Sequence, residues 1–173
     1  MNMPTLGDYW AIDMPDDIPP LFAPRQRVSN GSALTVSSIR VCLGRQNGTE
    51  SGPVHFEIWS DKTSGCPNGE PHCQEQQLGD DSDSFEVSAL ATMGSGTGAC
   101  GSASNGEEVT ITWTGNQPAP SANFWVAGVD DGVTGGEVRW GASAGDTYVD
   151  TNFDAWKGDV DRNNDFYFVV AGQ

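Results

Sequence analysis

The sequence predicts an all-β protein, an antiparallel β-sandwich with jelly-roll topology as the expected arrangement. Apolar residues recur at every second position in several short segments, which is the pattern of strands with one buried face. These segments are separated by turn clusters of Gly, Asn, Asp and Ser, and glycine alone accounts for 22 of the 173 residues. No segment keeps a helical period for more than about two turns.

Residues 1–30 are predicted to form an extended N-terminal arm. Residues 1–24 contain five prolines, and proline fixes φ and lacks a backbone N–H, which excludes a helix or a central strand. The arm also carries apolar side chains that a solvated linker does not need. We therefore expect it to lie on the domain itself or on a neighbouring subunit. The residues assigned to this assembly contact are Tyr9, Trp10, Leu21 and Phe22.

Residues 31–173 are predicted to form the β-sandwich domain. Each expected strand has apolar residues at alternate positions, and the threonines between some of them favour strands because β-branched side chains suit a pleated surface. The alternating apolar residues are Ile39, Val41 and Leu43; Val54, Phe56 and Ile58; Phe85 and Val87; Val109, Ile111 and Trp113; Phe124 and Val126; Val138 and Trp140; Phe166, Phe168 and Val170.

The charge of the chain limits the classes of partner. There are 24 Asp and Glu residues against 8 Lys and Arg residues, which gives a formal net charge of −16. Such a charge repels phosphate groups, so neither nucleic acid nor an anionic membrane is an expected partner. No apolar run approaches the roughly 18 residues that span a bilayer, so no membrane insertion is expected. The N-terminus does not resemble a secretory signal, so a signal has either been removed or was never present.

The four cysteines predict two disulfides. Cys66 and Cys73 close a short loop rich in Pro and Gly and are the preferred local pair, and Cys42 with Cys100 then follows by elimination. Sequence alone does not exclude other pairings. A zinc site that uses His72 is the alternative, although the cysteine spacing matches no recognised ligand pattern. Disulfides favour an oxidising final environment.

Three segments carry a resemblance to a known class of domain. VHFEIWSDKTSGCPNGEP (54–71), NFWVAGVDDGVTGGEVRW (123–140), and Trp156 followed by DFYFVVAG (165–172) resemble the jelly-roll domains of secreted bacterial surface proteins, including choice-of-anchor domains. They also resemble, more broadly, the sandwiches of carbohydrate-binding modules. The resemblance covers residues 34–173. It implies the fold and an extracellular or surface setting, but no substrate.

The segment DVDRNND is a candidate calcium site. Asp159, Asp161, Asn163 and Asp165 stand at alternate positions, and oxygens spaced in this way can converge on Ca²⁺. The segment lacks the glycine and the final glutamate of an EF-hand loop. A solvated turn is the alternative, because acidic loops are expected in a chain of this charge.

Two tryptophans are candidate ligand-binding residues. Trp59 falls on the polar phase of its strand, and Trp156 is expected in a loop beside Lys157. An aromatic ring with polar neighbours suits the C–H face of a sugar. Packing in the core or between loops is the alternative for each tryptophan.

No pattern indicates an enzyme. The segment GASAG (141–145) matches a nucleophile elbow, but both histidines of the chain, His55 and His72, precede it, and the expected strand–turn–helix context is missing. No spacing singles out two glutamates for glycoside hydrolysis. The sequence therefore predicts a protein without catalytic residues, and a small hydrolase is the least supported hypothesis.

The sequence thus predicts a structural or adhesive accessory protein. We expect it to be displayed on a virion or an extracellular filament or surface, anchored through its N-terminal arm. Its partners are then other protein subunits, including copies of itself. The alternative is a secreted glycan-binding module with structural calcium. Both hypotheses place the protein outside the cell or on a particle surface.

Overall fold

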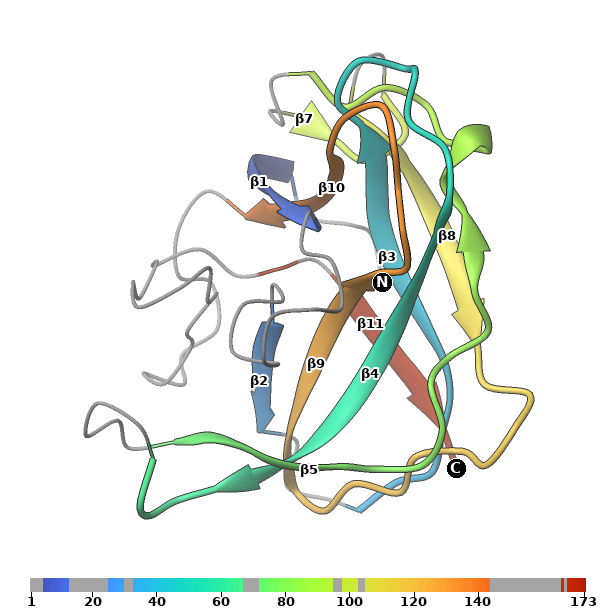
Figure 1. Ribbon diagram of the computed structural model, residues 1–173. Coiled ribbons are helices and arrows are strands. Elements are labelled where there is room, and N and C mark those ends of the chain that lie inside the picture. The colour runs from blue at the N-terminus through green and yellow to red at the C-terminus, as the bar shows by residue number, and fades with distance from the viewer. Residues whose placement is uncertain are drawn as a thin grey trace.

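The computed structural model describes residues 5–12, 25–29, 33–66, 72–94, 98–102, 105–143, 166 and 168–173. These residues form two antiparallel sheets that pack against each other, so the predicted β-sandwich is confirmed (Figure 1). The strands are β1 (Thr5–Ile12), β2 (Arg25–Ser29), β3 (Val36–Arg45), β4 (Pro53–Lys62), β5 (Cys73–Gln77), β6 (Phe85–Glu86), β7 (Gly98–Ala99), β8 (Glu107–Thr112), β9 (Asn123–Asp130), β10 (Val138–Ser143) and β11 (Phe168–Gly172). A short 3-10 turn, Val87–Ala89, follows β6.

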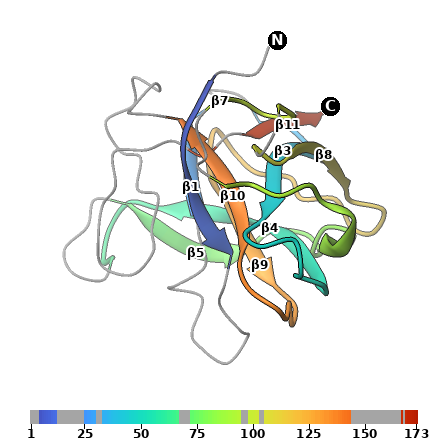
Figure 2. The ribbon, with the colours of Figure 1, turned by 90° about the horizontal axis from the view of Figure 1, so that it is seen from above.

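The six-stranded sheet is organised around β3. Its strand order is β11-β3-β10-β1-β7, and β8 also pairs with β3. Ile39 of β3 pairs with Ile111 of β8 on one edge and with Val170 of β11 on the other. Further along β3, Leu43 pairs with β10 instead of β11. Figure 2 shows β1 and β10 running side by side in this sheet.

The five-stranded sheet has the order β2-β9-β4-β5, and β6 pairs with the start of β4. Its central pair is β4 and β9, which cross the front of Figure 1 next to each other. Successive side chains of a strand point to opposite faces. In β4, Val54, Phe56 and Ile58 point into the core between the sheets. The residues between them therefore point to the outer face of the sheet.

Aromatic rings join the two sheets in the core. Trp140 of β10 is fully buried, and its ring stacks on that of Phe166 with the ring centroids 4.2 Å apart. Phe56 of the other sheet meets Trp140 edge to face at 5.0 Å. Most of the apolar residues predicted by alternation are buried, and Phe85, Phe168 and Val170 are partly buried against the same core.

The N-terminal part of the chain contributes a strand to each sheet. β1 pairs with β10 on one edge and with β7 on the other, and β2 pairs with β9. The prediction that residues 1–24 hold no central strand is therefore wrong. The described part of the predicted arm lies on the domain itself, which is one of the two placements expected for it. The prolines restrict the backbone only where they stand, and none lies within Thr5–Ile12 or Arg25–Ser29.

Both predicted disulfides are present. Cys66–Cys73 closes the connection between β4 and β5, and Cys42–Cys100 ties β3 to the turn after β7. All four cysteines are thereby used, so the zinc alternative for them is excluded. Disulfides persist in oxidising compartments, so they indicate a setting other than the cytoplasm.

The turn between β3 and β4 encloses a buried carboxylate. Glu50 is fully buried, and its side chain accepts hydrogen bonds from the backbone N–H groups of Asn47, at 2.9 Å, and Thr49, at 3.0 Å. Burial alone would raise the pKa of the Glu50 carboxyl, but hydrogen bonds from the surrounding backbone lower it below its ordinary value of 4.5. The ionised carboxylate therefore stabilises the turn.

We expect Ile12→Ala to destabilise the protein by roughly 2–5 kcal/mol. Ile12 is 1% exposed, belongs to the same core as Phe56 and lies over Gly128 of the other sheet. Chemical denaturation measures the free energy of unfolding, with Thr110→Ala at an exposed position of β8 as the control. A detached arm would leave both variants as stable as the wild type.

We expect Glu50→Gln to destabilise the protein at pH 7 by roughly 1–2 kcal/mol, because the amide offers fewer acceptors to the turn. A carboxyl whose pKa is lowered by folding stabilises above its unfolded pKa, and this contribution is lost as the pH falls through the folded value. The difference between wild type and variant should therefore shrink below about pH 4.5. Urea denaturation at neutral and acid pH measures it, and a difference that does not change with pH would contradict the prediction.

Candidate functional site on the outer face of the five-stranded sheet

The outer face of the five-stranded sheet carries a row of polar and aromatic side chains from β4. His55, Glu57, Trp59 and Asp61 stand at alternate positions, opposite in direction to the core residues of the same strand. Adjacent strands extend this row, because Trp59 pairs with Trp125 of β9 and with Gln77 of β5. Two groups of interacting side chains lie along it.

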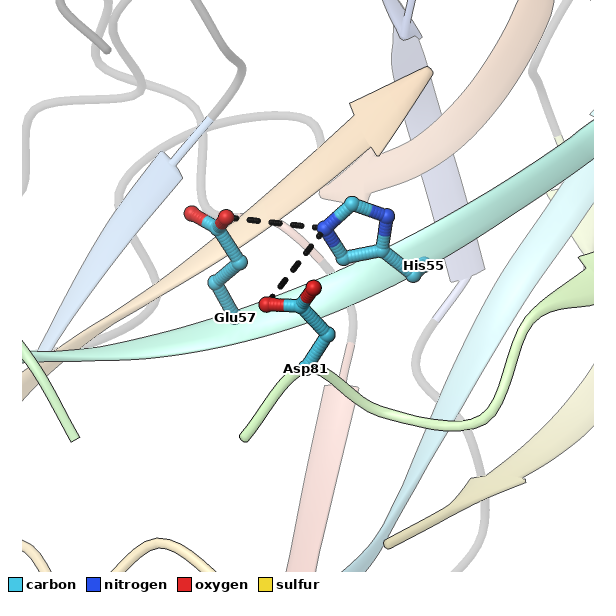
Figure 3. A group of neighbouring side chains, drawn as sticks. All are labelled: His55, Glu57 and Asp81. Atoms are coloured by element: carbon cyan, nitrogen blue, oxygen red, sulfur yellow. Dashed lines mark hydrogen bonds and ion pairs between the residues drawn. The ribbon is translucent and has the colours of Figure 1, made fainter. Parts of the chain in front are cut away.

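The first group, the His55 cluster, consists of His55, Glu57, Asp81 and Asp131. The imidazole Nδ1 lies 2.6 Å from Asp131 Oδ2. The other ring nitrogen, Nε2, lies 3.5 Å from Glu57 Oε1 and 3.9 Å from Asp81 Oδ1. Figure 3 shows the carboxylates of Glu57 and Asp81 directed at this same nitrogen.

Two loops bring the outer carboxylates to this cluster. The loop after β5 runs along β4, since Leu78 N donates to Ile58 O at 2.8 Å and Ser82 N donates to Phe56 O at 2.9 Å. These backbone bonds hold the intervening Asp81 beside β4. Asp131 follows β9 directly, and its own N–H donates to Pro53 O at 3.1 Å.

The carboxylates determine the charge of His55. Burial alone would lower the pKa of this imidazole, but hydrogen bonds to Glu57 and Asp131 and the negative charges of Asp131 and Asp81 raise it to about 9. The cluster therefore attracts a cation at the Nε2 edge of the ring. In the protein alone, that cation is the proton of the imidazolium.

Trp59 lies at the border of the His55 cluster. Its ring is half-buried, and its Nε1 donates to Glu57 Oε2 at 2.7 Å. This bond fixes the indole, and the other oxygen of Glu57, Oε1, faces His55. The predicted ligand-binding tryptophan is therefore held beside carboxylates on a partly accessible face.

The second group, the Asp61 cluster, joins Asp61 to Arg27, His72 and Trp125. Asp61 Oδ2 accepts from Arg27 Nη2 at 2.9 Å and lies 3.0 Å from His72 Nδ1. Asp61 Oδ1 accepts from Trp125 Nε1 at 2.9 Å. The Asp61 side chain is 4% exposed and that of Arg27 is 5% exposed, so this is a buried ion pair.

Arg25 extends the Asp61 cluster along β2. Its guanidinium lies 5.5 Å from the centre of the Trp125 ring, a cation–π geometry, and its Nη1 donates to Gln74 at 2.5 Å. Trp125 is therefore buried on the outer face of its sheet, outside the core between the sheets.

Of the remaining predicted site residues, two lie in β1 and the others lie outside the described part of the chain. Tyr9 and Trp10 belong to β1, where their backbones pair with Gly141 and Trp140. The predicted residues outside the described part of the chain are Leu21, Phe22, Trp156, Asp159, Asp161, Asn163 and Asp165. Calcium binding and the second ligand-binding tryptophan stay predictions.

Sequence reasoning did not find the His55 and Asp61 clusters. One signal was present, because the segment HFEIWSD alternates apolar residues with residues able to carry chemistry. Their partners, however, come from segments far away in the sequence. Asp81 and Asp131 are separated by 50 positions and meet at His55 only because β4 pairs with its neighbours.

Comparison of the chain with protein-family models, with curated proteins and with solved structures gave no match. The resemblance to jelly-roll surface domains therefore stays a prediction from the sequence. The described part of the chain contains no helix with the length and hydrophobicity of a membrane span.

We expect Asp61→Ala to destabilise the protein by roughly 3 kcal/mol, because it removes the partner of a buried arginine. The matched control is Glu108→Ala, which breaks the exposed pair with Arg40 and should cost less than about 1 kcal/mol. Urea denaturation measures both variants. An equal loss of unfolding free energy for the two substitutions would contradict the prediction, because it would show that burial does not strengthen the ion pair between Asp61 and Arg27.

Proposed function

We propose that this protein is a non-enzymatic adhesive module of an extracellular surface or particle, and that it binds neutral or amino sugars. The binding face is the outer face of the five-stranded sheet around Trp59. The observation that carries this proposal is the half-buried indole of Trp59, hydrogen-bonded to Glu57 beside three further residues of the His55 cluster.

The chemistry of this face suits a carbohydrate. An indole ring packs against the C–H face of a sugar, and carboxylates accept hydrogen bonds from its hydroxyl groups. The carboxylates of Asp81 and Asp131 are 56% and 25% exposed and can be reached from solvent. Their negative charge, in a chain of net charge −16, disfavours sialic and uronic acids.

The two disulfides support a setting outside the cytoplasm. Display on a virion or filament agrees with this setting. The described strands do not support anchoring through a free N-terminal arm, since β1 and β2 pair within the sheets. Adhesion through the face around Trp59 requires no such arm.

We expect Trp59→Ala to weaken glycan binding at least 10-fold, because it removes the stacking surface. A glycan array identifies the sugar, and calorimetry on the best neutral glycan measures the dissociation constant. Thr110→Ala, on the other sheet, is the control and should bind as the wild type does. The proposal is wrong if no neutral or amino sugar binds, or if a folded Trp59→Ala variant binds as tightly as the wild type.

A further inference from the structure

We propose that the His55 cluster is a binding site for a divalent transition-metal ion such as Zn²⁺. The ligands are His55 Nε2 and one carboxylate oxygen each from Glu57 and Asp81, and these three ligand atoms lie within 4.8 Å of one another. The site does not depend on sugar binding. Its ligands are other residues than those of the predicted calcium segment, 159–165.

The spacing of the three groups is that of ligands around an ion. A charge-assisted N–H···O bond brings nitrogen and oxygen to about 2.7–2.9 Å. Ligand atoms that share a tetrahedral ion at about 2.0–2.1 Å lie about 3.3 Å apart. The distances from His55 Nε2 are 3.5 Å to Glu57 and 3.9 Å to Asp81. They match the separation of ligand atoms around one ion better than the length of a charge-assisted hydrogen bond.

The imidazole distinguishes this site from an ordinary group of acidic side chains. The His55 side chain is 9% exposed, and its Nε2 edge is directed between two carboxylates (Figure 3). Its nearest partner there, Glu57 Oε1 at 3.5 Å, stands at the outer limit of a hydrogen bond. Imidazole nitrogen is a ligand for zinc, copper, nickel and iron, whereas calcium and magnesium take oxygen ligands.

Each ligand is oriented by a further hydrogen bond. Asp131 lies 2.6 Å from His55 Nδ1, so this nitrogen keeps its proton when Nε2, which faces the two carboxylates, gives up its own to bind an ion. Trp59 Nε1 donates to Glu57 Oε2 at 2.7 Å, and Gln77 Nε2 donates to Asp81 Oδ1 at 2.5 Å. Metal-binding histidines are commonly held by a carboxylate in this way.

The proposed metal site is open to solvent on one side. Asp81 is 56% exposed, so an ion can enter from solvent on its side. Three protein ligands leave a fourth tetrahedral position for water or for a donor atom of a bound molecule. The geometry is thus that of an open site.

The other histidine of the chain does not offer an equivalent site. His72 Nδ1 lies 3.0 Å from Asp61 Oδ2, and the same oxygen already accepts from the guanidinium of Arg27 at 2.9 Å. A positive charge at this position repels a metal ion. His72 is therefore a matched control for His55.

The test is calorimetric titration of the full chain, disulfides intact, with Zn²⁺ at about pH 8, where protons compete less for the imidazole than at neutral pH. We expect one ion per chain, with a dissociation constant in the micromolar range or below. Co²⁺ in place of zinc should give visible absorption with intensity typical of four or five ligands. His55→Gln and Asp81→Asn should each weaken Zn²⁺ binding at least 10-fold.

Two variants are the controls, His72→Gln and Glu75→Gln, the latter at an exposed carboxylate on β5. Both should bind Zn²⁺ as the wild type does. Asp131→Asn should weaken binding 10- to 100-fold, as expected for a group that orients a ligand. Asp81 is exposed, so Asp81→Asn keeps the test valid even if a His55 variant does not fold.

The proposal is overturned if the wild type binds no Zn²⁺, or if Asp81→Asn binds as tightly as Glu75→Gln. Because the titration uses the metal alone, its result is separate from that of the glycan experiment. A chain that binds Zn²⁺ but no sugar would contradict the proposed function and support the metal site.

Discussion

Strand β4 has a buried inner face and a half-buried outer face, and this constraint determines where the polar chemistry of the molecule lies. Its inner residues Val54, Phe56 and Ile58 fill the core between the sheets. The residues between them face outward, and of these His55 is only 7% exposed. A slip of one residue in the pairing of β4 would exchange these two sets, placing charges in the core. The apolar core and the polar outer face therefore fix the register together.

Charges on a shielded face must be paired, which explains why the outer face contains clusters and not isolated ions. Asp61 meets a guanidinium, an imidazole and an indole N–H. His55 meets carboxylates on both of its nitrogens. The two clusters differ in kind, because the Asp61 cluster is balanced by arginine whereas the His55 cluster has an excess of negative charge. That excess makes the His55 cluster the cation-binding end of the face.

The loops bring carboxylates to this face, and backbone hydrogen bonds to the sheet hold those loops in place. Asp81 stands on a loop that is hydrogen-bonded to β4 through backbone groups on either side of it. The Cys66–Cys73 disulfide closes the hairpin next to Asp61, at the other end of the face. Groups held in this way lose little freedom when a ligand or an ion binds, which favours affinity.

The sequence by itself predicted strands β3, β4, β6, β8, β9, β10 and β11 with most of their buried residues, and it favoured the two disulfides that are present. It could do so because a two-residue hydrophobic period and a short cysteine spacing are local properties. It misjudged residues 5–12, since proline content over a long segment does not reveal that an eight-residue stretch without proline can pair as a strand. It also did not reveal that His55, Glu57, Asp81 and Asp131 meet. Only the tertiary structure decided this, because their contact depends on strand pairing and loop placement between segments distant in the chain.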